Sequence, residues 1–420
     1  MKLTARELAL PPNPLRLASR LAGERQLAFL WSASGGGMSY IGVRPIAQSA
    51  ALDPEPELAT APGGSELERA PRWIGIVPYE SRRGLERPAW GSARDAREAP
   101  HFAEPVWWRF GAVVCVGERV SVVGDDASSV EDLSRQLMQA SESSPGEARL
   151  EELASEPPER HAERVRAALD LITQGQIYQV NLARRLELRV RGATMDLLRA
   201  VCRETRPAYA AAFRFDEARV ISTSPELLLE HRVGGRLMTS PIKGTRPRGK
   251  DAESDARLRE ELSRDSKERA ELSMIIDVER NDLGKVASIG SVRVQPPMVT
   301  THGLVWHRRA NVLAVLRPGV SRRELLEAML PSGSVTGAPK VRAMELIAEL
   351  EAARRGLYTG ALGFITHRGE MTLSMAIRTL TLEGESGHYF TGGGIVADSN
   401  PERELEETRW KARQLFGRAG

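Results

Sequence analysis

The chain has 420 residues, which exceeds an ordinary single domain and allows a large hydrophobic core. Hydrophobic residues make up 41% and charged residues 27%, and the net charge is only +3, so a nucleic-acid surface is not predicted. No apolar run approaches a membrane span, and two cysteines, Cys115 and Cys202, give no disulfide framework, so we expect a cytoplasmic globular protein without a membrane partner.

The first half of the chain predicts mostly strands. Residues 1–125 read as short strands and loops, with a strand at 26–32 and a strand pair at 110–124. Residues 126–157 are rich in Ser, Glu and Pro, which predicts a connecting helix with a mobile linker. A helical pattern follows at 161–173, and further strand patterns are at 186–190, 211–215 and 220–222.

The second half predicts longer helices between strands. Residues 251–282 look helical for most of their length, and a helix at 341–354, which Gly356 could terminate, precedes strands at 360–366 and 370–382. Asn400 is the expected N-cap of a last helix that opens with Pro401 and runs to about residue 416. Strands in this order favour antiparallel pairing over repeated βαβ units.

Lys243 carries the most chemical information. It lies in a Gly/Pro-rich segment, SPIKGTRPRG at 240–249, of a chain with seven lysines and 52 arginines. A desolvated ammonium can lose its proton and act as a nucleophile or base, which a guanidinium cannot. From this residue alone, an anion-binding or solvent-facing lysine remains the favoured alternative.

Several sequence blocks resemble the chorismate-utilising enzymes. The block around Lys243 is similar to the Pro-Ile-Lys-Gly-Thr motif in the form found in aminodeoxychorismate synthase component I, whereas anthranilate synthases carry alanine at the lysine position. The other matching blocks are IYQVNLAR at 177–184, SPEL at 224–227, RNDLG at 280–284, GAPK at 337–340, RGLYTG at 355–360, AIRT at 376–379 and GGGIVAD at 392–398. The resemblance is dense from about residue 158 to 415 and weak before that.

This resemblance implies a fold and a division of the chain. The fold would be α+β, with two large packed antiparallel β-sheets flanked by helices. Residues 1–125 would contribute to the same body, residues 126–157 would form a linker and helix, and residues 158–420 the chorismate-binding catalytic region. Family members often hold a tryptophan pocket in the N-terminal part, and Ser32 would lie in its wall, although a core strand is the alternative there.

Four glutamates share a spacing that suits a metal site. Glu268 and Glu271 lie three residues apart on a predicted helix, and Glu404 and Glu407 repeat this on the last helix. Each pair projects from one helical face, and two such faces could hold a hard cation such as Mg²⁺, although the spacing alone favours solvated faces. The resemblance aligns Glu271 and Glu407 with the main Mg²⁺ ligands of the family, and Glu268 and Glu404 with supporting carboxylates.

Arg378 is expected in a strand among apolar neighbours. A buried guanidinium needs an anionic partner, which could be a substrate carboxylate or an internal Asp or Glu. The resemblance implies that Arg378 and Tyr358 hold a substrate carboxylate, and that Thr245 and Thr336 also contact the substrate. The glycine run at 392–394 leaves room for backbone N–H groups to approach an anion, with a tight turn as the alternative; its members are Gly392, Gly393 and Gly394.

Two further residues are candidates for catalysis. Glu226 aligns with the family's general acid, a role that requires a raised pKa, whereas an ordinary ion-paired glutamate is the alternative. His307 aligns with a histidine of the family when the sequence is matched backwards without gaps from LRPG at 316–319. The residues after His307 differ from the usual Leu-Val-Ser of the family. A zinc site at His302 and His307 is rejected because no cysteine or third histidine lies nearby.

The implied reaction joins chorismate and ammonia to give 4-amino-4-deoxychorismate, towards 4-aminobenzoate and folate. Lys243 would attack ring carbon C2, Mg²⁺ would be the cofactor, and a separate glutaminase subunit would supply the ammonia, since the turn around Cys115 lacks the glycine and glutamine of a glutaminase nucleophile. Anthranilate synthase component I is the main alternative. Isochorismate synthase is a weaker one, because its members place a lysine where Gln179 stands. A non-catalytic chorismate- or tryptophan-binding regulator is the alternative from a different class.

Overall fold

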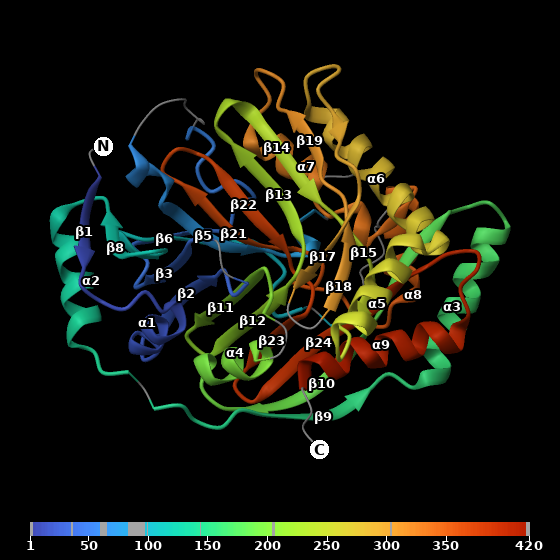
Figure 1. Cartoon of the computed structure of the whole chain (residues 1–420), viewed down its shortest axis with the longest axis horizontal. Coiled ribbons are helices and arrows are strands. Elements are labelled where there is room, and N and C mark those ends of the chain that lie inside the picture. Colours follow the sequence, from blue (N-terminus) through green and yellow to red (C-terminus); the bar gives the residue numbers. More distant parts are fainter. Residues whose placement is uncertain are drawn as a thin grey trace.

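The structure is a computed structural model that describes residues 3–34, 37–58, 65–82, 97–98, 100–142, 144–203, 206–302 and 305–416. Within these ranges, the strands pair antiparallel in sheets of twelve, nine and three strands, with helices around them (Figure 1). The expected α+β fold with two large antiparallel sheets flanked by helices is confirmed. The three-stranded sheet was not predicted.

The twelve-stranded sheet has the order β1-β8-β7-β3-β2-β11-β12-β23-β24-β10-β20, and β9 also pairs with β10. Its strands are β1 (Thr4–Leu8), β2 (Gln26–Trp31), β3 (Ser39–Val43), β7 (Ala112–Val116), β8 (Val120–Gly124), β9 (Arg149–Ser155), β10 (Gln179–Arg191), β11 (Tyr209–Phe215), β12 (Ala218–Ser224), β20 (Gly337–Ala338), β23 (Thr379–Glu383) and β24 (Ser386–Ile395). The strands expected from the first half of the sequence are all present.

The nine-stranded sheet has the order β16-β19-β14-β13-β22-β21-β5-β6-β4. Its strands are β4 (Ala47–Ser49), β5 (Pro71–Val77), β6 (Val106–Arg109), β13 (Leu227–Arg232), β14 (Arg236–Ser240), β16 (Arg293–Val294), β19 (Val312–Val315), β21 (Ala361–Thr366) and β22 (Met371–Met375). The small sheet comprises β15 (Ile242–Pro247), β17 (Met298–His302) and β18 (Val305–Arg309). Strands from the first 125 residues take part in both large sheets.

The two large sheets pack face to face over an apolar core. One buried cluster joins Ile74 and Trp108 of the nine-stranded sheet to Val113 and Phe213 of the twelve-stranded sheet. The ring of Trp108 lies 4.5 Å from that of Phe215. Side chains alternate between the faces of a strand, so each sheet keeps a second face for helices.

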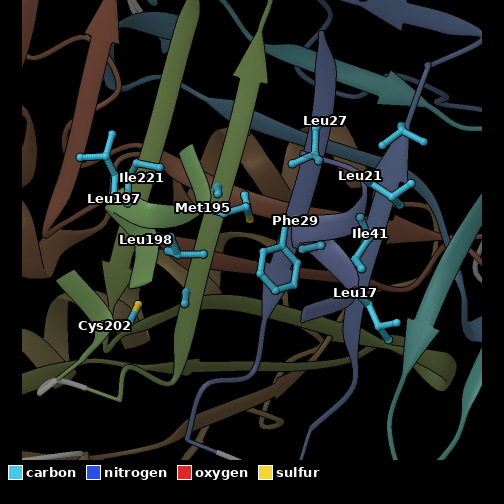
Figure 2. Close-up of a cluster of buried hydrophobic side chains, with 14 of the residues drawn as sticks. Leu17, Leu21, Leu27, Phe29, Ile41, Met195, Leu197, Leu198, Cys202 and Ile221 are labelled. Atoms are coloured by element: carbon cyan, nitrogen blue, oxygen red, sulfur yellow. The ribbon is translucent and has the colours of Figure 1, made fainter. Parts of the chain in front are cut away.

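Helices cover these outer faces. The twelve-stranded sheet is covered by α1 (Pro14–Arg20), α2 (Ala127–Gln139) and α4 (Thr194–Cys202). Leu17 of α1, Leu197 of α4 and Phe29 of β2 belong to one cluster of buried hydrophobic side chains (Figure 2). The nine-stranded sheet is covered by α6 (Ser266–Val286) and α7 (Arg322–Met329). The remaining helices are α3 (Pro158–Thr173), α5 (Ala252–Arg264), α8 (Lys340–Leu350) and α9 (Pro401–Phe416), and the short 3-10 helices are η1 (Glu66–Arg69), η2 (Tyr79–Arg82), η3 (Val233–Gly235) and η4 (Gly333–Val335).

Capping decides where several helices begin and end. The side chain of Asn400 accepts a hydrogen bond from the Arg403 N–H at 3.0 Å, which confirms the predicted N-cap of α9. The helical region at 251–282 is two helices, because Asp265 ends α5 and its side chain caps α6. The expected stop at Gly356 is wrong, since α8 already ends at Leu350.

Two strand predictions also need correction. Residues 149–155, expected in a mobile linker, form β9, which pairs with β10. The strand expected over 370–382 is interrupted between β22 and β23, where Arg378 has a φ of 51°. Arg378 therefore does not lie in a strand. Among the described residues, no helix is both long and apolar enough to cross a membrane.

Candidate functional site

A pocket of about 400 Å³ opens between the small sheet, α6, α9 and β24. This volume suits a small-molecule ligand. It gathers all but two of the expected site residues. Those that line it are Glu226, Lys243, Thr245, Glu268, Glu271, His307, Tyr358, Arg378, Gly392, Gly393, Gly394, Glu404 and Glu407.

Lys243 reaches the pocket from an irregular point of β15. The pairing of β15 with β18 shifts between Lys243 and Thr245, and Gly244 between them has a φ of 79°. Such a bulge redirects side chains, and glycine adopts this φ without strain. The Lys243 Nζ donates to the Ser334 carbonyl oxygen at 3.5 Å. The amine therefore lies inside the pocket rather than in solvent.

Glu226 is the most deeply buried carboxyl of the pocket. It follows β12, and its Oε1 accepts a hydrogen bond from the Ser334 Oγ at 2.8 Å. Burial raises the pKa of Glu226 to about 7, although the Ser334 hydroxyl and the Lys243 ammonium act in the opposite direction. A substantial fraction of Glu226 is therefore protonated near neutral pH, as a general acid must be.

His307 and Thr245 lie side by side on neighbouring strands of the small sheet. They are partners in the β15–β18 ladder, and the Thr245 Oγ1 lies 3.0 Å from the His307 Nδ1. This hydrogen bond fixes the orientation of the buried imidazole. The structure thus places both residues at the pocket, and their roles stay predictions.

Arg378 and Tyr358 form the opposite wall. Within the part of the chain that the structure describes, the Arg378 guanidinium makes no hydrogen bond or ion pair, so the internal Asp or Glu partner considered above is absent. Burial lowers the pKa of Arg378, while the nearby Tyr389 and Glu226 oppose that effect. The Tyr358 ring stacks on Phe390, with centroids 5.1 Å apart. The Arg378 guanidinium is thus available to an anionic ligand, beside a pocket wall that the stacked rings make rigid.

The glycine run lies within β24, near its C-terminal end, so the tight turn considered above is wrong. Gly393 pairs with Leu182 and Gly394 with Asn181 of β10. A Cβ on Gly393 would lie 3.1 Å from the Glu404 Oε2, and one on Gly394 would lie 3.5 Å from the Lys243 Nζ. Here glycine provides space beside charged groups rather than an unusual backbone angle.

The four glutamates lie in the same pocket, two on α6 and two on α9. Burial, followed by repulsion from Glu271, raises the pKa of Glu268, and burial also raises the pKa of Glu271 and Glu404. Burial acts on Glu407 too, but the Lys411 ammonium, 2.6 Å away, holds its pKa below the usual value. Negative charge is thus concentrated between these helices.

This donor set matches Mg²⁺ in chemistry, since carboxylate oxygens are the ligands that this ion prefers. In the described ranges, however, no three His, Cys, Asp or Glu side chains converge closely enough to hold a metal. Lysines occupy part of the space, because Lys267 lies 3.8 Å from Glu271 and Lys411 pairs with Glu407. Metal binding would require these pairs to open.

Two expected site residues lie elsewhere. Thr336 is fully buried, and its hydroxyl donates to the Ser332 carbonyl oxygen at 2.8 Å, so it does not line the pocket. Ser32 follows β2 and lines a separate cavity of about 600 Å³ with Trp31, Tyr40 and Tyr209. The structure therefore does not place Ser32 near the other candidates.

Sequence reasoning missed several pocket residues. Ser334 contacts both Lys243 and Glu226, and Lys267 and Lys411 also line the pocket. Lysine scarcity was the available signal, because three of the seven lysines in the chain meet here. An α+β fold whose pocket combines ammonium, guanidinium and carboxylate groups suits a small acidic ligand.

Comparison with known proteins identifies the family. The model of the chorismate binding enzyme family matches residues 28–417, and the chain belongs to this family. It is 45% identical over 259 residues to an anthranilate synthase component 1 from Thermus thermophilus, covering 61% of this chain and 56% of that protein. It is 42% identical over 261 residues to an aminodeoxychorismate synthase component 1 from Klebsiella aerogenes, covering 61% and 57%. The chain thus spans about half the length of the curated relatives it matches.

Solved structures show the same fold over nearly the whole chain. Anthranilate synthase component I from Streptococcus pneumoniae superposes with a TM-score of 0.75 at 26% identity, covering 99% of this chain and 92% of that one. The menaquinone-specific isochorismate synthase MenF from Escherichia coli gives a TM-score of 0.78 at 19% identity, covering 99% and 94%. The latter likeness concerns the fold alone.

Proposed function

We propose that this protein is an aminodeoxychorismate synthase component I, which converts chorismate and ammonia into 4-amino-4-deoxychorismate. The observation that carries the proposal is the Lys243 amine inside the pocket, with the protonatable Glu226 close by. An amine and a buried acid supply the nucleophile and the proton donor for a displacement in two steps. Several of the similar relatives are named anthranilate synthases, so the product is the property to test.

In the first step, the Lys243 amine, in the deprotonated form that a nucleophile requires, forms a bond to ring carbon C2 and the ring double bonds shift. The C4–O bond breaks, and Glu226 gives its proton to the departing hydroxyl, which leaves as water. In the second step, ammonia bonds to C4, the double bonds shift back, and the C2–N bond to Lys243 breaks, which restores the neutral amine. Ammonia enters neutral and remains on the product as an ammonium group, so each turnover consumes the proton of Glu226.

The other groups would hold the substrate. Arg378 and Tyr358 are placed to receive a carboxylate, and fixed orientation supplies much of the rate in such reactions. Glu271 and Glu407, supported by Glu268 and Glu404, would hold Mg²⁺, which polarises a substrate carboxylate when bound.

The ammonia would come from a separate glutaminase subunit. Both cysteines of the chain are buried, and burial raises the pKa of the Cys115 thiol to about 12. A buried thiol of high pKa is a poor nucleophile. The chain therefore offers no cysteine for releasing ammonia from glutamine.

Product analysis tests the proposal. The protein is incubated with chorismate, Mg²⁺ and ammonium, and 4-amino-4-deoxychorismate is expected by chromatography and mass. Lys243→Ala is expected to lower its formation at least about 100-fold, with anthranilate as any residual product. Lys250→Ala, at an exposed lysine directly after this segment, is the matched control. Anthranilate from the unaltered protein would favour the anthranilate synthase alternative, and unchanged turnover in Lys243→Ala would exclude the covalent step.

A further inference from the structure

Two serine hydroxyls connect Glu226 to a second buried carboxyl. The Ser334 Oγ lies 2.8 Å from the Glu226 Oε1 and 3.0 Å from the Ser332 Oγ, which lies 2.5 Å from the Glu279 Oε1. The exposed fractions of Glu226, Ser334, Ser332 and Glu279 are 5%, 4%, 2% and 0%. Each hydroxyl can donate and accept at once, so this row of oxygens can pass a proton from one carboxyl to the other.

Local structure holds the row in place. Glu279 projects from α6 towards η4, and the Ser332 Oγ accepts a hydrogen bond from the Ser334 N–H at 3.1 Å as the cap of η4. Gly333 permits the close approach of the two elements, because a Cβ there would lie 2.2 Å from the Val278 Cγ1. The distances therefore follow from backbone packing as well as from side-chain rotamers.

Glu226 must regain a proton in each turnover if the proposed function is right. Its proton leaves with the C4 hydroxyl as water. Ammonia keeps its three protons as the ammonium group of the product, so it returns none to Glu226. The carboxylate that remains is a buried part of the pocket wall, with Lys243, Arg378 and Ser334 around it. A proton must therefore return to it once in every cycle.

We propose that Glu279, Ser332 and Ser334 form a relay that returns a proton to Glu226 after each turnover. This inference rests on the proposed function. The Glu279 carboxyl gives its proton to the Ser332 Oγ while Ser332 passes its own to the Ser334 Oγ and Ser334 passes its own to the Glu226 Oε1. Every O–H bond that breaks is replaced by one that forms, and Glu279 ends as a carboxylate that regains a proton from water.

The surroundings of Glu279 suit a proton store. Burial, followed by repulsion from Asp282, raises the pKa of Glu279, while Lys340, Ser332 and Thr239 oppose this. At neutral pH the two carboxyls at the ends of the relay thus hold protons more tightly than ordinary glutamates.

The far side of Glu279 leads towards solvent. Asp282 forms ion pairs with the buried Lys340 and with Lys285, whose Nζ lies 3.1 Å from the Asp282 Oδ1. The Lys285 side chain is 47% exposed. Glu279 therefore lies between the pocket and a charged cluster that reaches the surface.

Replacing the middle hydroxyl tests the relay. Ser332→Ala is expected to lower kcat on the order of tenfold, with the KM for chorismate unchanged and the loss growing as pH rises. Ser332→Thr restores a hydroxyl and should recover most of the rate. Glu279→Gln should match Ser332→Ala, and the double variant should be no slower than either, because both break one path. Ser134→Ala, a fully buried serine on α2, is the matched control.

Infrared spectroscopy gives a readout that does not need turnover. The carboxylic acid band of Glu279 should disappear in Glu279→Gln, and Glu226→Gln should shift its titration only while Ser332 is present. A normal kcat and pH profile in Ser332→Ala would overturn the relay. A titration of Glu279 that is the same in Glu226→Gln as in the unaltered protein would also overturn it. If the unaltered protein made another product while the coupled titration held, the proposed function would fail and the connection between the carboxyls would stand.

Discussion

Glu226→Gln is expected to stabilise the protein at alkaline pH although it removes the proposed acid. Burial raises the pKa of Glu226 to about 7, against an ordinary value of 4.5. At 1.36 kcal/mol for each pH unit, ionising this buried carboxyl costs roughly 3 kcal/mol. As pH rises, Glu226 ionises at lower pH in the unfolded chain than in the folded protein. Its favourable contribution to the free energy of unfolding is therefore complete below pH 4.5 and is lost by the time pH passes about 7.

Urea unfolding at about pH 5 and about pH 8 measures this effect. Glutamine has the same shape and keeps the acceptor for the Ser334 hydroxyl, but it never carries the charge. Glu226→Gln should be more stable than the unaltered protein by about 3 kcal/mol at the higher pH and by less than about 1 kcal/mol at the lower. Glu402→Gln, an exposed residue on α9, is the control. An equal gain in the free energy of unfolding at both pH values would refute the electrostatic reasoning, because a change in packing does not depend on pH.

Three further predictions concern the pocket and its support. Glu407→Ala is expected to abolish Mg²⁺-dependent activity in a metal titration, whereas its exposed neighbour Glu406→Ala should respond normally; a normal response in Glu407→Ala would overturn its assignment as a ligand. Arg378→Ala is expected to raise the KM for chorismate roughly 10–100-fold in steady-state kinetics, and an unchanged KM would contradict its role as the carboxylate partner. Glu351→Ala should cost about 3–5 kcal/mol of unfolding free energy because it leaves the buried Arg355 without its carboxylate partner, whereas Glu345→Ala, in a more exposed pair, should cost less than about 1 kcal/mol; equal losses would contradict this.

Much of the fold could be predicted because it depends on local signals. The cap at Asn400 and the alternating strands at 211–215 and 220–222 act within a few residues, and the structure confirms them. The break at Arg378 carries no such signal. Its positive φ is uncommon outside glycine and is maintained by packing between β22 and β23, which depends on residues distant in the sequence.

The candidate site could be predicted where its residues belong to the family motifs. The blocks around Lys243, Glu226 and Arg378 come together in one pocket, although the structure leaves their roles as predictions. Glu279 was missed because a glutamate in a long helix usually faces solvent. Only the tertiary packing of α6 against η4 shows that this carboxyl is buried and bonded to Ser332.

A shared fold cannot select among reactions of chorismate, so the choice depends on a few groups in and beside the pocket. An isochorismate synthase is expected to carry a lysine base where Gln179 stands, since it must activate water. Here Gln179 is fully buried, and its amide makes no hydrogen bond with any described residue. A carboxamide is no base, so it cannot take a proton from water. Ammonia needs no such activation, and Lys243 offers the amine for a covalent path. Both residues therefore support the proposed amination rather than hydration.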